Sequence, residues 1–146
     1  MASVAPEAPG PSEPSPPSGT AHGFGRVLVA VYGLFALSAT ARAGVQIATQ
    51  FDAAPVPYLL SAFAGVVYLG ATVALARSSR TAWRTALACC SIEFLGVLTV
   101  GTVSRVMSAE FPDATVWSDY GSGYGFVPAI LPVVGLYWLY RNRPKR

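Results

Sequence analysis

The stretch from Val56 to Ala76, VPYLLSAFAGVVYLGATVALA, decides the class of this protein. It contains no Asp, Glu, Lys, Arg or His over its whole length. A helix of about 20 residues rises about 30 Å, which is the thickness of the hydrocarbon core of a bilayer. Because the bilayer interior offers the backbone no water, such a segment closes its hydrogen bonds internally as a helix. The stretch therefore predicts a transmembrane helix.

Three further stretches predict three more spans. They run from about Arg26 to Ile47, from about Arg84 to Val103 and from about Ser122 to Tyr140. All four are continuously apolar rather than alternating, which excludes a transmembrane β-barrel. The predicted fold is all-α: a polytopic membrane protein with four transmembrane helices in a domain over residues 24–141.

The composition excludes a soluble globular protein and a wholly disordered one. Of the 146 residues, 53% are hydrophobic and 12% are charged, whereas soluble domains contain about 25% charged residues. Two cysteines cannot form a disulfide scaffold, and the single histidine argues against a histidine-based metal site. We therefore expect no metal and no cofactor.

The two ends of the chain are polar. Residues 1–23 hold half of the prolines, mixed with Ser, Ala and Gly, and this composition predicts a disordered tail, with a docking tail as the alternative. Residues 142–146 form a basic tail. The basic tail and the arginines at 77, 80 and 84 adjoin apolar stretches, and the chain has no folded polar domain. Their expected partners are water and anionic lipid headgroups of the bilayer rather than nucleic acid.

The basic residues also predict the orientation. With four spans both termini lie on one side, together with eight basic residues: Arg26, Arg77, Arg80, Arg84, Arg141, Arg143, Lys145 and Arg146. The other side has two, Arg42 and Arg105. The positive-inside rule places both termini in the cytoplasm. Aromatic residues are expected as anchors at the two interfaces, with Trp83, Tyr137, Trp138 and Tyr140 inside and Tyr58, Phe111, Trp117, Tyr120 and Tyr124 outside.

A signal peptide is the alternative for the first span. Val27 to Leu37 followed by small residues around Ala41 resembles the apolar core and cleavage site of such a peptide. Against cleavage, the preceding residues contain only one arginine, and the apolar pattern resumes after Arg42. We expect the first span to be retained.

Two ionisable residues lie inside the predicted spans, and such residues are functional candidates because charge is costly there. Arg42 shares a helix face with Gln46 and other polar residues, so it faces either other helices or, by extending its side chain, the headgroups. Glu93 lies nine residues after Arg84, which places it about 13 Å deep. A carboxyl group at that depth is either paired or protonated. Because Arg42 is expected at a different depth, a direct pair needs helix tilt or a bridging water, and we expect a protonated Glu93.

Three other motifs have structural explanations. Cys89 and Cys90 are adjacent in a helix, where they fit small packing residues better than a redox pair. Ser122-Gly123-Tyr124-Gly125 resembles the filter of potassium channels, but no apolar pore helix precedes it, so we expect a flexible connection. Pro128 and Pro132 predict a kink in the last span, because each removes an amide donor.

Three segments together resemble a known group of proteins: Tyr32 to Phe51 (YGLFALSATARAGVQIATQF), Pro57 to Ser61 (PYLLS) and Phe111 to Pro128 (FPDATVWSDYGSGYGFVP). The chain resembles uncharacterised small four-helix integral membrane proteins of actinobacteria, which carry no assigned activity. The resemblance covers most of residues 27–140. It implies a multi-pass protein of a bacterial inner membrane and transfers no catalytic residue.

The sequence leaves three functional hypotheses open. We favour a non-enzymatic accessory or assembly protein that acts by helix–helix association. Besides the lipid bilayer, the expected partner is another membrane protein or, in a homo-oligomer, a second copy of the chain. The alternative is a small oligomeric transporter or pore in which Glu93, Arg42 and a kinked last span line the path. A membrane enzyme has the least support, because it needs polar residues clustered at one depth, and the sequence offers only the outer group of Asp113, Asp119 and Tyr120.

Overall fold

The computed structural model describes residues 2–6, 8–11 and 19–145. Residues 2–6 and 8–11 form no helix or strand. Residues 12–18 of the predicted disordered tail lie outside the described residues. The first helix begins at Gly19, so the helical part starts before residue 24, where the sequence had placed it. Extending a formed helix by a turn adds one hydrogen bond per residue, which explains why helix α1 runs past its apolar segment.

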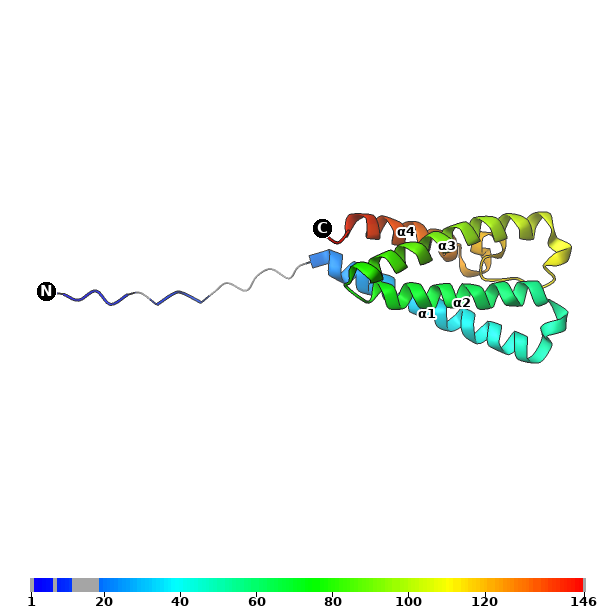
Figure 1. Cartoon of the computed structure of the whole chain (residues 1–146), viewed down its shortest axis with the longest axis horizontal. Coiled ribbons are helices and arrows are strands. Elements are labelled where there is room, and N and C mark those ends of the chain that lie inside the picture. Colours follow the sequence, from blue (N-terminus) through cyan, green and yellow to red (C-terminus); the bar gives the residue numbers. More distant parts are fainter. Residues whose placement is uncertain (1, 7, 12–18, 146) are drawn as a thin grey trace.

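Four helices run along the long axis of an elongated bundle (Figure 1): α1 (Gly19–Gln50), α2 (Pro55–Leu75), α3 (Arg80–Val106) and α4 (Val127–Arg141). Consecutive helices run in opposite directions and pack side by side. Three short 3₁₀ helices lie in the connections: η1 (Phe51–Ala53), η2 (Ser108–Glu110) and η3 (Ser118–Tyr124). The described residues contain no strand. The architecture is an up-and-down helical bundle.

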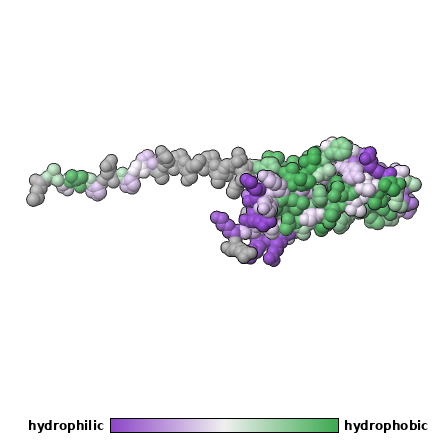
Figure 2. Space-filling view, turned by 90° about the horizontal axis from the view of Figure 1, so that it is seen from above, coloured by the Kyte–Doolittle hydropathy of each residue, from purple (hydrophilic) through white to green (hydrophobic). Residues whose placement is uncertain are grey.

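The two ends of the bundle differ in charge. We call the end that carries Arg26, Arg77 and Asn142 the basic end. The opposite end carries the connections 51–54 and 107–126, and we call it the acidic end because Asp52, Glu110, Asp113 and Asp119 belong to these connections. A belt of apolar surface lies between polar ends in the space-filling view (Figure 2). This distribution of polarity suits a bundle that crosses a bilayer.

Three helices are long and apolar enough to cross a membrane, and they correspond to Gly23–Ala53, Pro55–Leu75 and Arg80–Val106. A fourth span exists only if η3 and α4, which meet at 99°, count as one broken span. Helix α4 has 15 residues, which is about 22 Å of helix and shorter than the hydrocarbon core. The predicted span from Ser122 to Tyr140 is therefore not one continuous helix.

Local interactions explain where the helices begin. Pro55 is the first residue of α2, a position where its missing amide hydrogen costs no hydrogen bond. Ser79 caps α3, because its hydroxyl oxygen accepts a hydrogen bond from the amide of Ala82 at 3.0 Å. Within the helices, four threonine hydroxyls donate to the carbonyl one turn earlier: Thr49, Thr72, Thr85 and Thr102. These bonds satisfy the hydroxyl groups within their own helices, as a dry surrounding requires.

Helices α1 and α2 approach closely because small residues lie between them. A β-carbon at Gly65 would lie 3.2 Å from the backbone nitrogen of Thr40 and 2.7 Å from its hydroxyl oxygen. Ser61, four residues before Gly65, is also buried. Small residues at this spacing let two membrane helices pack backbone to backbone. This contact fixes how α1 presents Tyr32 to the centre of the bundle.

Candidate functional site

Glu93 lies on α3 in the centre of the bundle and is fully buried, with 0% of its surface exposed. The Tyr32 hydroxyl of α1 donates a hydrogen bond of 2.7 Å to Glu93 Oε2. The same hydroxyl lies 3.3 Å from the sulfur of Cys90, one turn before Glu93. The three side chains form one buried polar cluster, which we call the Glu93 cluster.

Helix α4 closes the Glu93 cluster from a third side. A β-carbon at Gly135 would lie 3.0 Å from Cys90 Sγ and 3.2 Å from the Tyr32 hydroxyl oxygen. Because glycine has no β-carbon, α4 packs directly against the Glu93 cluster at this position. Hydrogen bonds therefore join α1 to α3 at this cluster, and α4 packs against it. Sequence reasoning had identified only Glu93 as a candidate site residue among its members.

No described cation neutralises Glu93. Its Oε1 atom is buried without a hydrogen-bond partner among the described residues, and the ion pairs of the described structure involve Arg42 and Arg105 with other carboxylates. An isolated ionised carboxylate is very costly to bury, whereas a neutral carboxyl with one strong hydrogen bond is tolerated. The geometry therefore favours a protonated Glu93 that links helices through Tyr32.

Arg42 and Gln46 lie near the acidic end, in a second polar network that does not include Glu93. The Arg42 guanidinium lies 3.6 Å from Asp113 Oδ1, and it donates to the Tyr124 hydroxyl at 3.0 Å and to the Ala114 carbonyl at 3.3 Å. Gln46 donates to Asp113 Oδ2 at 3.2 Å. We call this group the Arg42–Asp113 network. It joins α1 to the long connection.

Tyr58 of α2 completes the Arg42–Asp113 network by donating to Asp113 Oδ2 at 3.1 Å. The Asp113 carboxylate therefore accepts hydrogen bonds from side chains of both α1 and α2. Sequence reasoning did not name Asp113 as the partner of Arg42. Both members of the ion pair are about a third exposed, at 39% for Arg42 and 36% for Asp113. Such an exposed pair contributes little stability by itself, so its role is to position the connection.

Trp117 is the largest correction to the sequence analysis. It was expected to lie at the outer interface as an aromatic anchor, but it is 1% exposed and inserts from the long connection into the bundle. Its indole nitrogen donates to the Tyr68 hydroxyl at 3.0 Å. A β-carbon at Gly96 would lie 2.6 Å from its ring, so the glycine of α3 provides the space that the indole occupies.

The backbone around Trp117 is held by a local hydrogen-bonded turn. Thr115 donates its amide hydrogen to the Ser118 hydroxyl oxygen at 2.9 Å, and Ser118 donates its amide hydrogen to Thr115 Oγ1 at 3.0 Å. Both side chains are buried. Threonine and serine often satisfy backbone groups in this way in turns. The hydroxyl groups of Thr115 and Ser118 are thus satisfied by hydrogen bonds within the turn.

The segment before α4 bends through left-handed backbone rather than at a proline. Gly125 and Phe126 have φ of 63° and 61°, and the 99° bend lies at this point. Pro128 occupies the first turn of α4, where it interrupts no helical hydrogen bond, so the kink predicted there is wrong in position. Pro132 does lie inside α4. Tyr124 of the filter-like motif contacts Arg42, as a structural residue of the connection would.

Comparison with known proteins finds no matching family model, no similar curated protein and no similar solved structure. The candidate site is therefore interpreted from its own geometry. Sequence reasoning proposed one intramembrane site with Arg42, Gln46 and Glu93, and the structure places these residues in two separate networks.

Proposed function

We propose that this chain is a multi-pass protein of a bacterial inner membrane that acts without catalysis, as an accessory or assembly factor that associates through its helix surfaces. The observation that carries this proposal is the sealed Glu93 cluster. The carboxyl group is 0% exposed and bonded to Tyr32 of a different helix. Polar side chains that join helices in this way are common structural links in membrane bundles.

The surface that remains for recognition is apolar. Large hydrophobic side chains are exposed on all four helices, among them Leu34, Val66, Leu95 and Ile130. The other buried polar side chains mostly serve contacts inside the bundle, such as Trp117 with Tyr68. A protein built in this way offers lipid and other membrane helices a surface for packing rather than for chemistry.

The alternative function, a small oligomeric transporter or pore, finds less support. It needs Glu93 and Arg42 along one path. Arg42 instead contacts Asp113 and Tyr124 near the acidic end, whereas Glu93 contacts Tyr32. Neither the cleft at the basic end nor the apolar groove between α1 and α4 is lined by Glu93 or Arg42. A path through both residues would require a rearrangement of the bundle or a second copy of the chain.

Membrane orientation is the first test of the proposal. We expect reporter fusions at Ser79 and after Arg146 to report the cytoplasm, and a fusion near Asp113 to report the outside, because the basic residues gather at the basic end. A periplasmic-type signal from the Ser79 fusion would contradict the orientation and the number of spans together. The fusion near Asp113 is the matched control, since it lies at the opposite end of the bundle.

Co-purification tests the accessory role. We expect the chain, tagged after Arg146 and extracted from native membranes in mild detergent at its natural level, to run as a complex with a different membrane protein at fixed stoichiometry. A clean homodimer with no other protein would contradict the accessory role and favour transport. A chain that runs alone as a monomer would also contradict it.

A pair of substitutions tests whether the association uses a defined surface. An apolar groove of about 180 Å³ runs between α1 and α4, and Ile130 lines it. Ile130→Trp fills this groove, whereas Leu95→Trp makes the same change on α3; both side chains are more than half exposed, at 57% and 62%. We expect the partner, an apolar transmembrane helix, to be lost with Ile130→Trp and retained with Leu95→Trp.

A further inference from the structure

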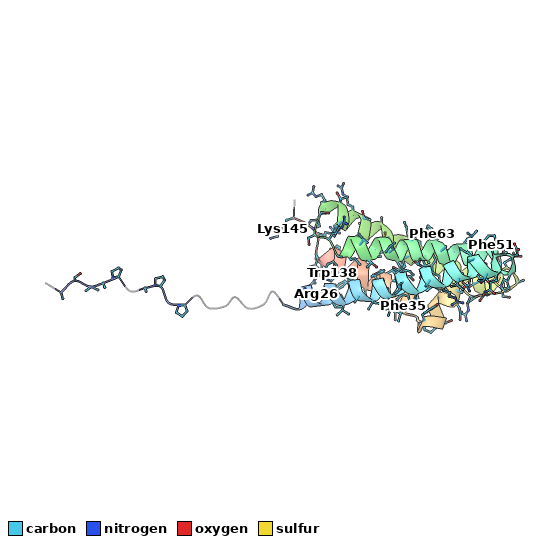
Figure 3. All side chains as sticks on the ribbon, turned by 90° about the horizontal axis from the view of Figure 1, so that it is seen from below. Arg26, Phe35, Phe51, Phe63, Trp138 and Lys145 are labelled. Atoms are coloured by element: carbon cyan, nitrogen blue, oxygen red, sulfur yellow. The ribbon has the colours of Figure 1, made fainter. Side chains whose placement is uncertain are left out.

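A cleft lies at the basic end, away from both polar networks. Its volume is about 510 Å³, within the range of small-ligand sites. It is bounded by the start of α1, the α2–α3 turn and the end of α4. Figure 3 labels two of its residues, Arg26 and Trp138, at this end of the molecule. The cleft therefore opens where the headgroup layer of a bilayer would lie.

The rim of the cleft is cationic and contains no carboxylate. Arg26 and Arg77 line it, and neither forms an ion pair with a described carboxylate. Of the acidic residues in the helical part, Glu93 is buried in the core and the others belong to the acidic end. A cleft lined by two guanidinium groups that form no ion pair among the described residues, and by no described carboxylate, attracts an anion.

The lining of the same cleft includes a tryptophan whose indole donor is buried without an acceptor among the described residues. Trp138 lines it, and its indole nitrogen is buried with no hydrogen-bond partner among the described residues. By contrast, the indole nitrogen of Trp83, also in the lining, donates to the Leu139 carbonyl at 3.0 Å. Leaving a buried N–H group unbonded is costly, so a ligand oxygen beside Trp138 would remove that cost.

The wall of the cleft is apolar. Val29, Ala74 and Leu75 line it together with the Trp83 side chain. A small inorganic anion uses only the rim, whereas an amphiphile uses both the rim and the wall. Basic pockets between transmembrane helices at the cytoplasmic face are recognised sites for phosphate-bearing lipid headgroups.

We propose that this cleft is a specific binding site for an anionic phospholipid. Arg26 and Arg77 hold the phosphate, the Trp138 indole donates to a phosphate or ester oxygen, and the upper acyl chain lies along the apolar wall. The proposal concerns the basic end alone and does not depend on the accessory role.

The test uses the full-length protein purified in detergent, with native mass spectrometry and thermal unfolding measured against added phosphatidylglycerol or phosphatidylcholine. We expect phosphatidylglycerol to bind and to raise the unfolding midpoint, and phosphatidylcholine to do neither. Arg26→Gln with Arg77→Gln should weaken phosphatidylglycerol binding about thirtyfold, since two arginine contacts are lost. Trp138→Phe should weaken it about tenfold, because the ring remains and the donor is lost.

The matched control is Arg80→Gln with Arg84→Gln, which removes the same charge at the same end from residues outside the cleft. We expect binding within about threefold of the wild type. Equal losses from the two double variants would overturn the site in favour of diffuse surface attraction. Unchanged binding by the cleft variant, or displacement of the lipid by millimolar inorganic phosphate, would also overturn the proposal. Circular dichroism and elution volume verify that each variant is folded.

Discussion

Trp117→Ala is expected to lower the free energy of unfolding by about 3–5 kcal/mol, the usual cost of removing a large buried aromatic side chain. The indole is 1% exposed and fills the space above Gly96. Its removal leaves a cavity between α2 and α3 and releases the Tyr68 hydroxyl from its bond. Equilibrium unfolding in mixed micelles, followed by circular dichroism, measures the change.

Trp117→Phe separates packing from hydrogen bonding. The variant keeps most of the ring and loses the donor to Tyr68, so we expect a cost of about 1 kcal/mol. Tyr68→Phe removes the acceptor of the same hydrogen bond, and its free energy of unfolding is compared with that of Trp117→Phe. If Trp117→Ala unfolds with the same free energy as the wild type, Trp117 is a surface anchor, and the inserted position of the connection is wrong.

Substitutions of Glu93 are expected to differ in their effect on the free energy of unfolding according to the charge that they introduce. Glu93→Gln keeps the shape and can still accept the hydrogen bond from Tyr32, so we expect a cost below about 1 kcal/mol. Glu93→Lys places an uncompensated charge at a fully buried position and should cost about 3–5 kcal/mol or prevent folding. The same unfolding measurement compares both variants with the wild type.

The control for Glu93 is Arg42→Gln, alone and combined with Glu93→Gln. Arg42 belongs to the exposed network around Asp113, so its substitution should change stability by less than about 1 kcal/mol. The double variant should show the sum of the two single effects, because the groups do not interact. A strongly destabilised Glu93→Gln that is rescued by Arg42→Gln would establish an ion pair and contradict the protonated Glu93.

The apolar stretches predicted the helices, because a run without charged residues leaves the backbone few alternatives in a membrane. The position of Glu93 along its helix was also accessible from the sequence, since helical rise converts residue spacing into distance along the helix axis. Its partner Tyr32 was not. The partner depends on how α1 and α3 are rotated about their axes, and that rotation is set by contacts such as Gly65 with Thr40.

The long connection could not be predicted from its residue types. Trp117 was expected as an outer aromatic anchor, yet Thr115 and Ser118 bond to each other's backbone and let Trp117 enter the bundle. The space for the indole comes from Gly96, which lies on α3 and not in the connection itself. No pattern within the connection therefore predicts that Trp117 is buried. Likewise, a left-handed backbone conformation is not expected of an aromatic residue such as Phe126. Because Phe126 adopts it, α4 begins at Val127 rather than near Ser122, where the predicted span began.

We infer that Glu93 is a sealed structural link rather than a group on a solute path. Labelling with a membrane-permeant carbodiimide, followed by mass spectrometry of the wild-type protein in proteoliposomes, tests it most directly. Such reagents modify protonated carboxyl groups that they can reach. Protein unfolded in dodecyl sulfate serves as the positive control for labelling at Glu93.

We expect Glu93 to be modified in the unfolded protein and protected in the folded one, because its side chain is 0% exposed and bonded to Tyr32. Rapid modification of Glu93 in the folded protein would show that the carboxyl group is reached from the bilayer or from a water path. That result would contradict the sealed cluster and support transport.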